Sequence, residues 1–168
     1  PYPNLDYFQV RGAIGVLSDG MSSRLFTEVR EKRGLCYTVY ASCHSLRDRG
    51  GVFAYAGTTA ERAQETLDVL TAEVVKLHDG VSDIELSRLK RRIKRALIIQ
   101  QESSSARAGS LAHDWFYLQR IRPIEELRTI IDGLSASSIN HYLAAHRPRE
   151  FSVVTLGKKP LETTHGIS

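Results

Sequence analysis

Arg30 and Tyr37 are the two residues whose types and spacing suggest chemistry. They stand seven residues apart, with Gly34 between them. A helical pattern ends close to Arg30 and a β-rich pattern begins at Tyr37, so a chain reversal at Gly34 would let both side-chain tips converge at one end of a sheet. A guanidinium and a phenol are good hydrogen-bond donors for a peptide carbonyl that becomes an oxyanion. Spacing alone favours a structural role, in which Arg30 pairs with Glu28 or Glu31 and Tyr37 caps the core.

The spacing of histidines and cysteines predicts no metal site in this chain. A zinc peptidase motif needs two histidines at i and i+4 of a helix, beside a carboxylate. The six histidines contain no such pair, and the nearest two, His141 and His146, are five apart. Cys36 and Cys43 are seven apart in one predicted strand, where an odd separation places side chains on opposite faces and disfavours a disulfide. We therefore expect a reduced, intracellular chain that holds no zinc.

Two further runs of residues are better explained by structure than by binding. Six cations occur in the eight positions from Arg88 to Arg95. Leu86, Leu89 and Ile93 lie on one side of the same predicted helix, which leaves the cations on a solvated face and favours no contact with nucleic acid. The aromatic run Trp115–Tyr117 has no basic or glycine-rich surroundings and is interpreted as core or domain-interface packing.

The composition is that of one globular domain. The chain has 168 residues, of which 42% are hydrophobic and 25% charged, and a net charge of +4. We assign the domain to residues 1–159 and expect a frayed polar tail at 160–168. Apolar runs are much shorter than the roughly 18 residues of a membrane-spanning helix, and the N-terminus lacks a signal-peptide pattern, so we expect no membrane contact and a cytoplasmic location. The chain opens without Met, which suggests a piece of a longer protein.

Hydrophobic periodicity predicts an α+β fold. Helices are expected at 5–17 and 23–33, then a β-hairpin of strands 37–46 and 51–57, then a series of helices. The first of these is capped by Thr59, and Ser82 with Glu85 forms a capping box for the long helix that ends near residue 101. A final strand is expected at 151–156. The result is an antiparallel sheet with helices layered on one face, whose exposed edge, left by a strand missing upstream, would pair with a second copy to give a homodimer.

The segment from Met21 to Tyr37 has the pattern SSRLF-x-E-VREKRGL-x-Y, which packing alone does not explain. Here the chain resembles the pitrilysin/insulinase-type zinc peptidases, which include the mitochondrial processing peptidases, and in particular the second, zinc-free half of such proteins. The resemblance continues through the hairpin, the joint at Gly80 and the final predicted strand, and so covers nearly the whole chain.

The resemblance implies a protein of two duplicated α+β halves. The N-terminal half would hold zinc through an H-x-x-E-H motif and a distal Glu, and this chain would be the C-terminal half without its first strand. It also implies that Arg30 and Tyr37 contact the peptide substrate near the scissile bond. The expected function is therefore that of a substrate-binding, chamber-closing domain of a zinc metalloendopeptidase, inactive in isolation.

Two other functions fit the same resemblance. In the first, the chain is part of a zinc-free regulatory or substrate-binding subunit that lends Arg30 and Tyr37 to a partner subunit carrying H-x-x-E-H. In the second, it is a structural interaction module like the core proteins of a respiratory complex. An H-x-x-E-H motif upstream of Pro1 would favour the peptidase, and the presence of both Arg30 and Tyr37 disfavours the purely structural module.

Overall fold

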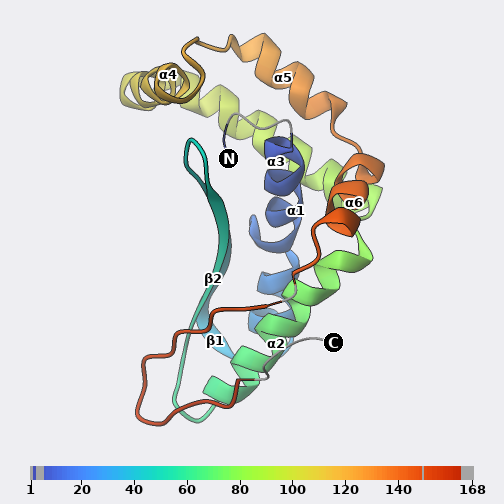
Figure 1. Cartoon of the computed structure of the whole chain (residues 1–168), viewed down its shortest axis with the longest axis vertical. Helices are drawn as coiled ribbons and strands as arrows, with labels where there is room; N and C mark the ends of the chain where they lie inside the picture. Colours follow the sequence, from blue (N-terminus) through green and yellow to red (C-terminus); the bar gives the residue numbers. More distant parts are fainter. Residues whose placement is uncertain (1, 3–5, 149, 164–168) are drawn as a thin grey trace.

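A β-hairpin stands along one side of the molecule, and the helices pack against one of its faces (Figure 1). The computed structural model describes residues 2, 6–148 and 150–163. Its elements in chain order are α1 (Tyr7–Ser18), the π-helix η1 (Phe26–Glu31), β1 (Cys36–Ser45), β2 (Gly50–Thr58), α2 (Ala63–Lys76), the 3-10 helix η2 (Leu77–Asp79), α3 (Asp83–Glu102), α4 (Ser104–Leu118), α5 (Ile124–Gly133) and α6 (Ala136–Ala145). The predicted α+β class, with the helices on one face of an antiparallel sheet, is confirmed.

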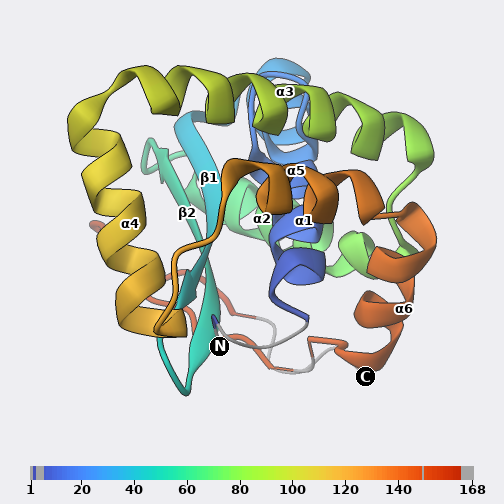
Figure 2. The same cartoon turned by 90° about the horizontal axis from the view of Figure 1, so that it is seen from above.

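The core lies between α1, the inner face of the hairpin and the helices beyond. Leu17 of α1, Leu25 and Val29 before and within η1, and Ile139 of α6 are fully buried. This cluster is covered by alternate residues of β1, as expected of a strand with one buried face: Val39, Ala41 and Cys43. Helix α3 runs across the molecule, and α4 folds back from its end (Figure 2).

Three of the six α-helices that the structure describes begin at a side-chain cap. The predicted capping box is present, because the Ser82 hydroxyl accepts from the Glu85 amide and the Glu85 carboxylate accepts from the Ser82 amide. Ser135 and Ser138 form a second capping box at α6, and the Ser103 hydroxyl accepts from the Ala106 amide at the start of α4. The predicted cap at Thr59 is wrong: a turn closed by the Arg62 N–H and the Thr59 carbonyl comes first, and α2 begins at Ala63.

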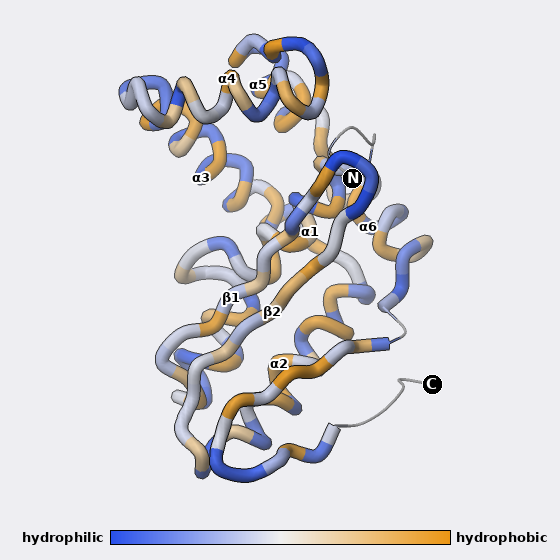
Figure 3. The backbone as a smooth tube through the Cα atoms, turned by 60° about the vertical axis from the view of Figure 1, so that its left-hand side comes forward, coloured by the Kyte–Doolittle hydropathy of each residue, from blue (hydrophilic) through white to orange (hydrophobic). Residues whose placement is uncertain are grey.

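The predicted third strand is also wrong. Residues 151–156 have no regular secondary structure and make no ladder with the described strands, and Val154 and Leu156 are 94% and 104% exposed. Figure 3 shows this segment as a hydrophobic run outside the hairpin. A β-rich pattern becomes a strand only where an edge is free to pair, and part of the β1 edge is taken: the Ala41 N–H donates to Ser18 Oγ at 2.6 Å. The predicted homodimer through a sheet edge stays a prediction.

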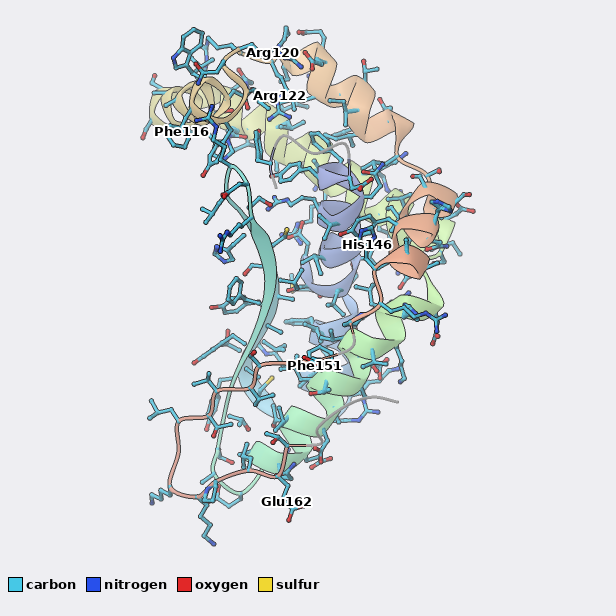
Figure 4. The ribbon with its side chains drawn as sticks, viewed as in Figure 1. Phe116, Arg120, Arg122, His146, Phe151 and Glu162 are labelled. Carbon is cyan, nitrogen blue, oxygen red and sulfur yellow. The ribbon has the colours of Figure 1, made fainter. Side chains whose placement is uncertain are left out.

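The expected tail at 160–168 is described as far as Thr163. The backbone N–H of Glu162 donates to the Gln64 side-chain oxygen at 2.8 Å, and the Gln64 side-chain N–H donates to the Glu162 carbonyl at 3.0 Å. These two hydrogen bonds tie this part of the chain to α2 (Figure 4). Residues 164–168 lie outside the described residues.

The prediction that Cys36 and Cys43 face opposite sides is wrong. Cys36 is buried, and Cys43 packs against the same core. The register shifts by one residue between Cys36 and Thr38, and this β-bulge restores both thiols to one face. A strand of this length still separates them by roughly 20 Å, far beyond the reach of a disulfide.

The two surface runs have different outcomes. Arg88, Arg91 and Arg95 lie exposed on α3, which agrees with a solvated face. Core packing is wrong for Trp115 and Phe116, which are 59% and 61% exposed on α4, so domain-interface packing remains the prediction for both. None of the helices in the described part of the chain combines the length and apolar composition that crossing a bilayer requires.

Candidate functional site

Arg30 and Tyr37 lie at the two ends of one tight connection between η1 and β1. Gly34 has φ +59°, in the left-handed region that favours glycine. Its N–H donates to the Arg30 carbonyl at 2.9 Å, and the Leu35 N–H donates to the Val29 carbonyl at 3.0 Å. The chain therefore reverses between the two predicted site residues, as the sequence indicates.

The helix before this turn is wound as a π-helix. The Lys32 N–H donates to the carbonyl of Thr27, five residues earlier, at 2.9 Å. Leu25 and Val29 on its inner side are fully buried. Arg30 comes next on the outside, where its guanidinium carbon lies 5.1 Å from the centre of the Phe26 ring. Burial of the inner side and contact with Phe26 thus hold Arg30 at the surface.

Tyr37 is the extra residue of the β-bulge. Cys36 pairs with Thr58 and Thr38 pairs with Gly57, so no residue of β2 stands opposite Tyr37. Tyr37 is 74% exposed, although the residue before it is buried. A bulge changes the direction of a side chain that regular alternation would fix, and this one leaves the phenol in solvent.

The contacts expected of a purely structural role are not found for these two residues in the described part of the chain. Glu28 pairs with Lys32 at 2.6 Å and with Arg33 at 3.0 Å, and these two hydrogen bonds lower the pKa of its carboxyl. Within the described residues, Arg30 has no carboxylate in an ion pair. The exposure of Tyr37 excludes a role in capping the core. Both donors are therefore available to a group outside this chain.

Cys36 connects the surroundings of the two residues. Burial raises the pKa of its thiol, and the positive charge of Arg30 partly offsets that rise. The hydrogen bond from the Leu35 N–H to the Val29 carbonyl places the backbone beside Arg30 next to the start of β1. The pair shares one end of the hairpin.

Three side chains that sequence reasoning missed hold the turn in place. Arg62 Nη1 donates to the carbonyls of Arg33 at 3.1 Å and Gly34 at 2.7 Å. The hydroxyls of Thr58 and Thr66 both donate toward the next carbonyl, that of Leu35. The connection is therefore held from α2 and the end of β2. No local pattern marks Arg62, because its bond partners lie 28 and 29 residues away.

A second contact ties the helical segment that carries Arg30 to α3. The Arg24 guanidinium donates two hydrogen bonds to the Glu85 carboxylate, at 2.7 and 3.0 Å, and a third to the Gly80 carbonyl at 2.7 Å. The hydrogen bond from Arg24, helped by those from Ser82, lowers the pKa of Glu85 to about 2. This paired-bond geometry is the strongest form of an ion pair and fixes the helix relative to the capping box.

The described residues do not offer a metal site beside these donors. No group of three or more His, Cys, Asp or Glu side chains among them lies close enough to hold an ion. A groove of about 590 Å³ lies between α1, α3 and the inner side of β1, but neither Arg30 nor Tyr37 lines it. The arrangement can therefore donate hydrogen bonds to a substrate but supplies no nucleophile or metal of its own.

Comparison with known proteins identifies the family of this chain. Residues 2–93 match the model of the peptidase M16 inactive domain. An uncharacterized zinc protease of Mycobacterium bovis is 32% identical over 143 residues, which are 84% of this chain and 32% of that protein. The chain thus spans about a third of the length of that relative.

Solved structures of other proteins share the fold of this chain. The peptidase M16 inactive domain from Pseudomonas fluorescens has a TM-score of 0.76 and 26% identity, over 86% of this chain and 35% of that one. A chain of complex III2 from Candida albicans, with a TM-score of 0.72 and 17% identity over 85% of this chain and 36% of that one, shares the fold alone. The match over more than half of the sequence decides the assignment: this chain is an inactive, C-terminal domain of the peptidase M16 family.

Proposed function

We propose that this chain is the substrate-binding, chamber-closing C-terminal domain of a zinc metalloendopeptidase, and that Arg30 and Tyr37 contact the scissile peptide. The observation that carries the proposal is the pair of exposed donors, without an ion pair or a core role, at the ends of a turn held by Arg62.

The chemistry follows from the two donors. When a peptide carbonyl is attacked, its oxygen gains negative charge, and a donor placed at that oxygen stabilises the transition state by about 2.7–4 kcal/mol. Arg30 would supply a positive charge and several N–H donors in one plane, and Tyr37 would supply a single hydroxyl donor. The described residues do not fit a zinc ion, so zinc would belong to an N-terminal H-x-x-E-H half. The matched residues make up 32% of the Mycobacterium bovis relative, and the remaining length of that protein supports a half in the same polypeptide.

Two substitutions in the complete enzyme test the proposal. Tyr37→Phe removes one hydroxyl and Arg30→Lys removes the fork but keeps the charge, so each should lower kcat/KM by about 10- to 1000-fold. The melting temperature should stay within about 2 °C, because neither change opens a cavity. Tyr142→Phe and Arg95→Lys are matched controls on α6 and α3 and should change neither quantity.

The competing packing role predicts the reverse. It requires a lower melting temperature in Tyr37→Phe and Arg30→Lys, with turnover per folded molecule preserved. Unchanged kcat/KM in both variants would end the assignment of Arg30 and Tyr37 to the site.

A further inference from the structure

The hairpin face turned away from the helices carries a row of exposed aromatic side chains. Val39, Ala41 and Cys43 point into the core, so the alternate residues of β1 point outward. Tyr40 stands opposite Tyr55 in the ladder, and Ser42 stands opposite Phe53, which puts these side chains on the same outer face. We call this surface the aromatic face; its rings are Tyr40, His44, Phe53 and Tyr55. Figure 4 shows side chains projecting from the hairpin on this side.

The rings of the aromatic face are exposed but support one another. Tyr40, Phe53 and Tyr55 are 48%, 60% and 51% exposed. The centres of the Tyr40 and Tyr55 rings lie 5.4 Å apart, and those of His44 and Phe53 lie 5.2 Å apart with the rings nearly perpendicular. Both are favourable aromatic geometries, so the rings are ordered before any partner arrives. Binding to ordered side chains costs less entropy.

The aromatic face leads to the proposed site. Tyr37, at the start of β1, lies beyond the Tyr40 end of the row, and the backbone carbonyl of Arg30 is bonded to the Gly34 turn that precedes the same strand end. From Thr38 to His44 the strand extends roughly 20 Å, the length of about six residues of an extended peptide. A peptide bound at Arg30 and Tyr37 would therefore meet the row along its length.

The charges around the face define the peptide that fits it. Neither β1 nor β2 contains an aspartate, glutamate, lysine or arginine. Arg30 stands at one end without an ion pair among the described residues, and Arg47 stands exposed at the hairpin tip, where Asp48 pairs with Arg49 at 3.8 Å. A neutral aromatic row between two arginines is complementary to apolar side chains with acidic residues at the ends. A basic peptide would meet like charge at both ends.

We propose that the aromatic face binds the extended peptide substrate away from the scissile bond and selects peptides with aromatic or large aliphatic side chains at alternate positions and acidic flanks. The inference rests on the proposed function, because it assigns the substrate class of the same site. Alternate positions are required because every second side chain of an extended peptide faces the same way.

The test uses the complete enzyme and an uncleavable ten-residue peptide in which the scissile bond is reduced. Fluorescence anisotropy measures the binding of the peptide. Four peptides carry either Phe or Ala at alternate positions and either Glu or Lys at both ends. We expect Phe to tighten binding about tenfold over Ala. Glu ends should bind about three- to tenfold more tightly than Lys ends, and that ratio should shrink in 0.5 M NaCl because the charges are exposed. No preference for Phe would overturn the proposal.

Variants locate the preference on the aromatic face. The double variant Tyr40→Ala/Tyr55→Ala should lose most of the Phe preference, while Trp115→Ala, an equally exposed aromatic on α4, should keep it. If the double variant misfolds by circular dichroism, Phe53→Ser replaces it. A preference unchanged in the folded variant would overturn the proposal. So would a concentration-dependent dimer of the enzyme that these substitutions abolish, because the face would then be an interface between copies.

Failure of this inference is distinguishable from failure of the proposed function. Anisotropy of uncleaved peptides does not depend on turnover. If Tyr37→Phe lowers kcat/KM but the double variant binds all four peptides as the parent does, only the inference on the aromatic face fails. If the double variant loses selectivity while both Tyr37→Phe and Arg30→Lys turn over normally, the assignment of Arg30 and Tyr37 in the proposed function fails and the peptide-binding face stands.

Discussion

Replacing Glu85 by glutamine tests how strongly the site-bearing helical segment is fastened to α3. The pKa of Glu85 is about 2 in the folded chain, against 4.5 for an ordinary glutamate. A difference of about 2.5 units corresponds to roughly 3.4 kcal/mol at neutral pH. The Arg24 and Glu85 side chains are 21% and 26% exposed, so solvent screening reduces the expected loss in Glu85→Gln to about 1–2 kcal/mol.

The sign of the pH dependence follows from the direction of the shift. Because the folded-state pKa lies below the unfolded one, the ionised carboxylate stabilises the fold fully above about pH 5.5. That stabilisation is lost as the pH falls from about 4.5 through about 2. The difference in unfolding free energy between the parent and Glu85→Gln should therefore be largest at pH 7 and fall to less than half by pH 3.

Urea denaturation at pH 7, 5, 4 and 3 measures this difference, since the linear extrapolation gives an unfolding free energy at each pH. Glu102→Gln, at the exposed far end of the same helix, is the matched control and should track the parent throughout. A gap that stays constant with pH, or no gap at pH 7, would refute the reasoning from the Arg24 contact.

Four further outcomes are expected. Gly34→Ala should cost about 1–2 kcal/mol in denaturation experiments, because the left-handed conformation strains a residue with a Cβ; no loss would contradict that geometry. Asp114→Ala should cost about 3–5 kcal/mol by the same method, since it leaves Arg122 and the Tyr2 hydroxyl buried without their acceptor, and a loss below 1 kcal/mol would contradict the burial. Arg62→Ala should lower kcat/KM of the complete enzyme about tenfold with partial recovery in Arg62→Lys, and equal activity of all three would show that the turn needs no support. Metal analysis of the dialysed chain should find no stoichiometric zinc, and about one tightly held ion per chain would refute this.

Local chemistry predicted the elements well. The Ser82–Glu85 capping box and the turn at Gly34 are both present, because each depends on residues only a few positions apart. The exposure of Tyr37 beside the buried Cys36 was not predictable from such short-range patterns. A bulge depends on the register of two strands, and periodicity within one strand does not reveal it.

Long-range contacts account for the remaining errors. The carbonyls that Arg62 bonds lie 28 and 29 residues away in the sequence, beyond the range of a local sequence pattern. The strand expected at 151–156 has the right residue types but no ladder partner, since pairing depends on the rest of the sheet rather than on the segment itself. Arg30 and Tyr37 could be named from the sequence only by resemblance, whereas the structure shows that Tyr37 is exposed and that Arg30 makes no ion pair with the described residues.

The π-helix and the β-bulge add residues to the candidate site that the surrounding fold does not need. Each is equivalent to one inserted residue, in η1 and at Tyr37, on either side of the Gly34 turn. Deleting one residue from η1 would restore ordinary helical winding. Deleting Tyr37 would restore regular alternation, with Cys36 still paired with Thr58 and Thr38 still paired with Gly57. Single-residue deletions at these two places would therefore remove or redirect the donors while the flanking elements keep their pairing, a kind of change that substitution scanning never samples.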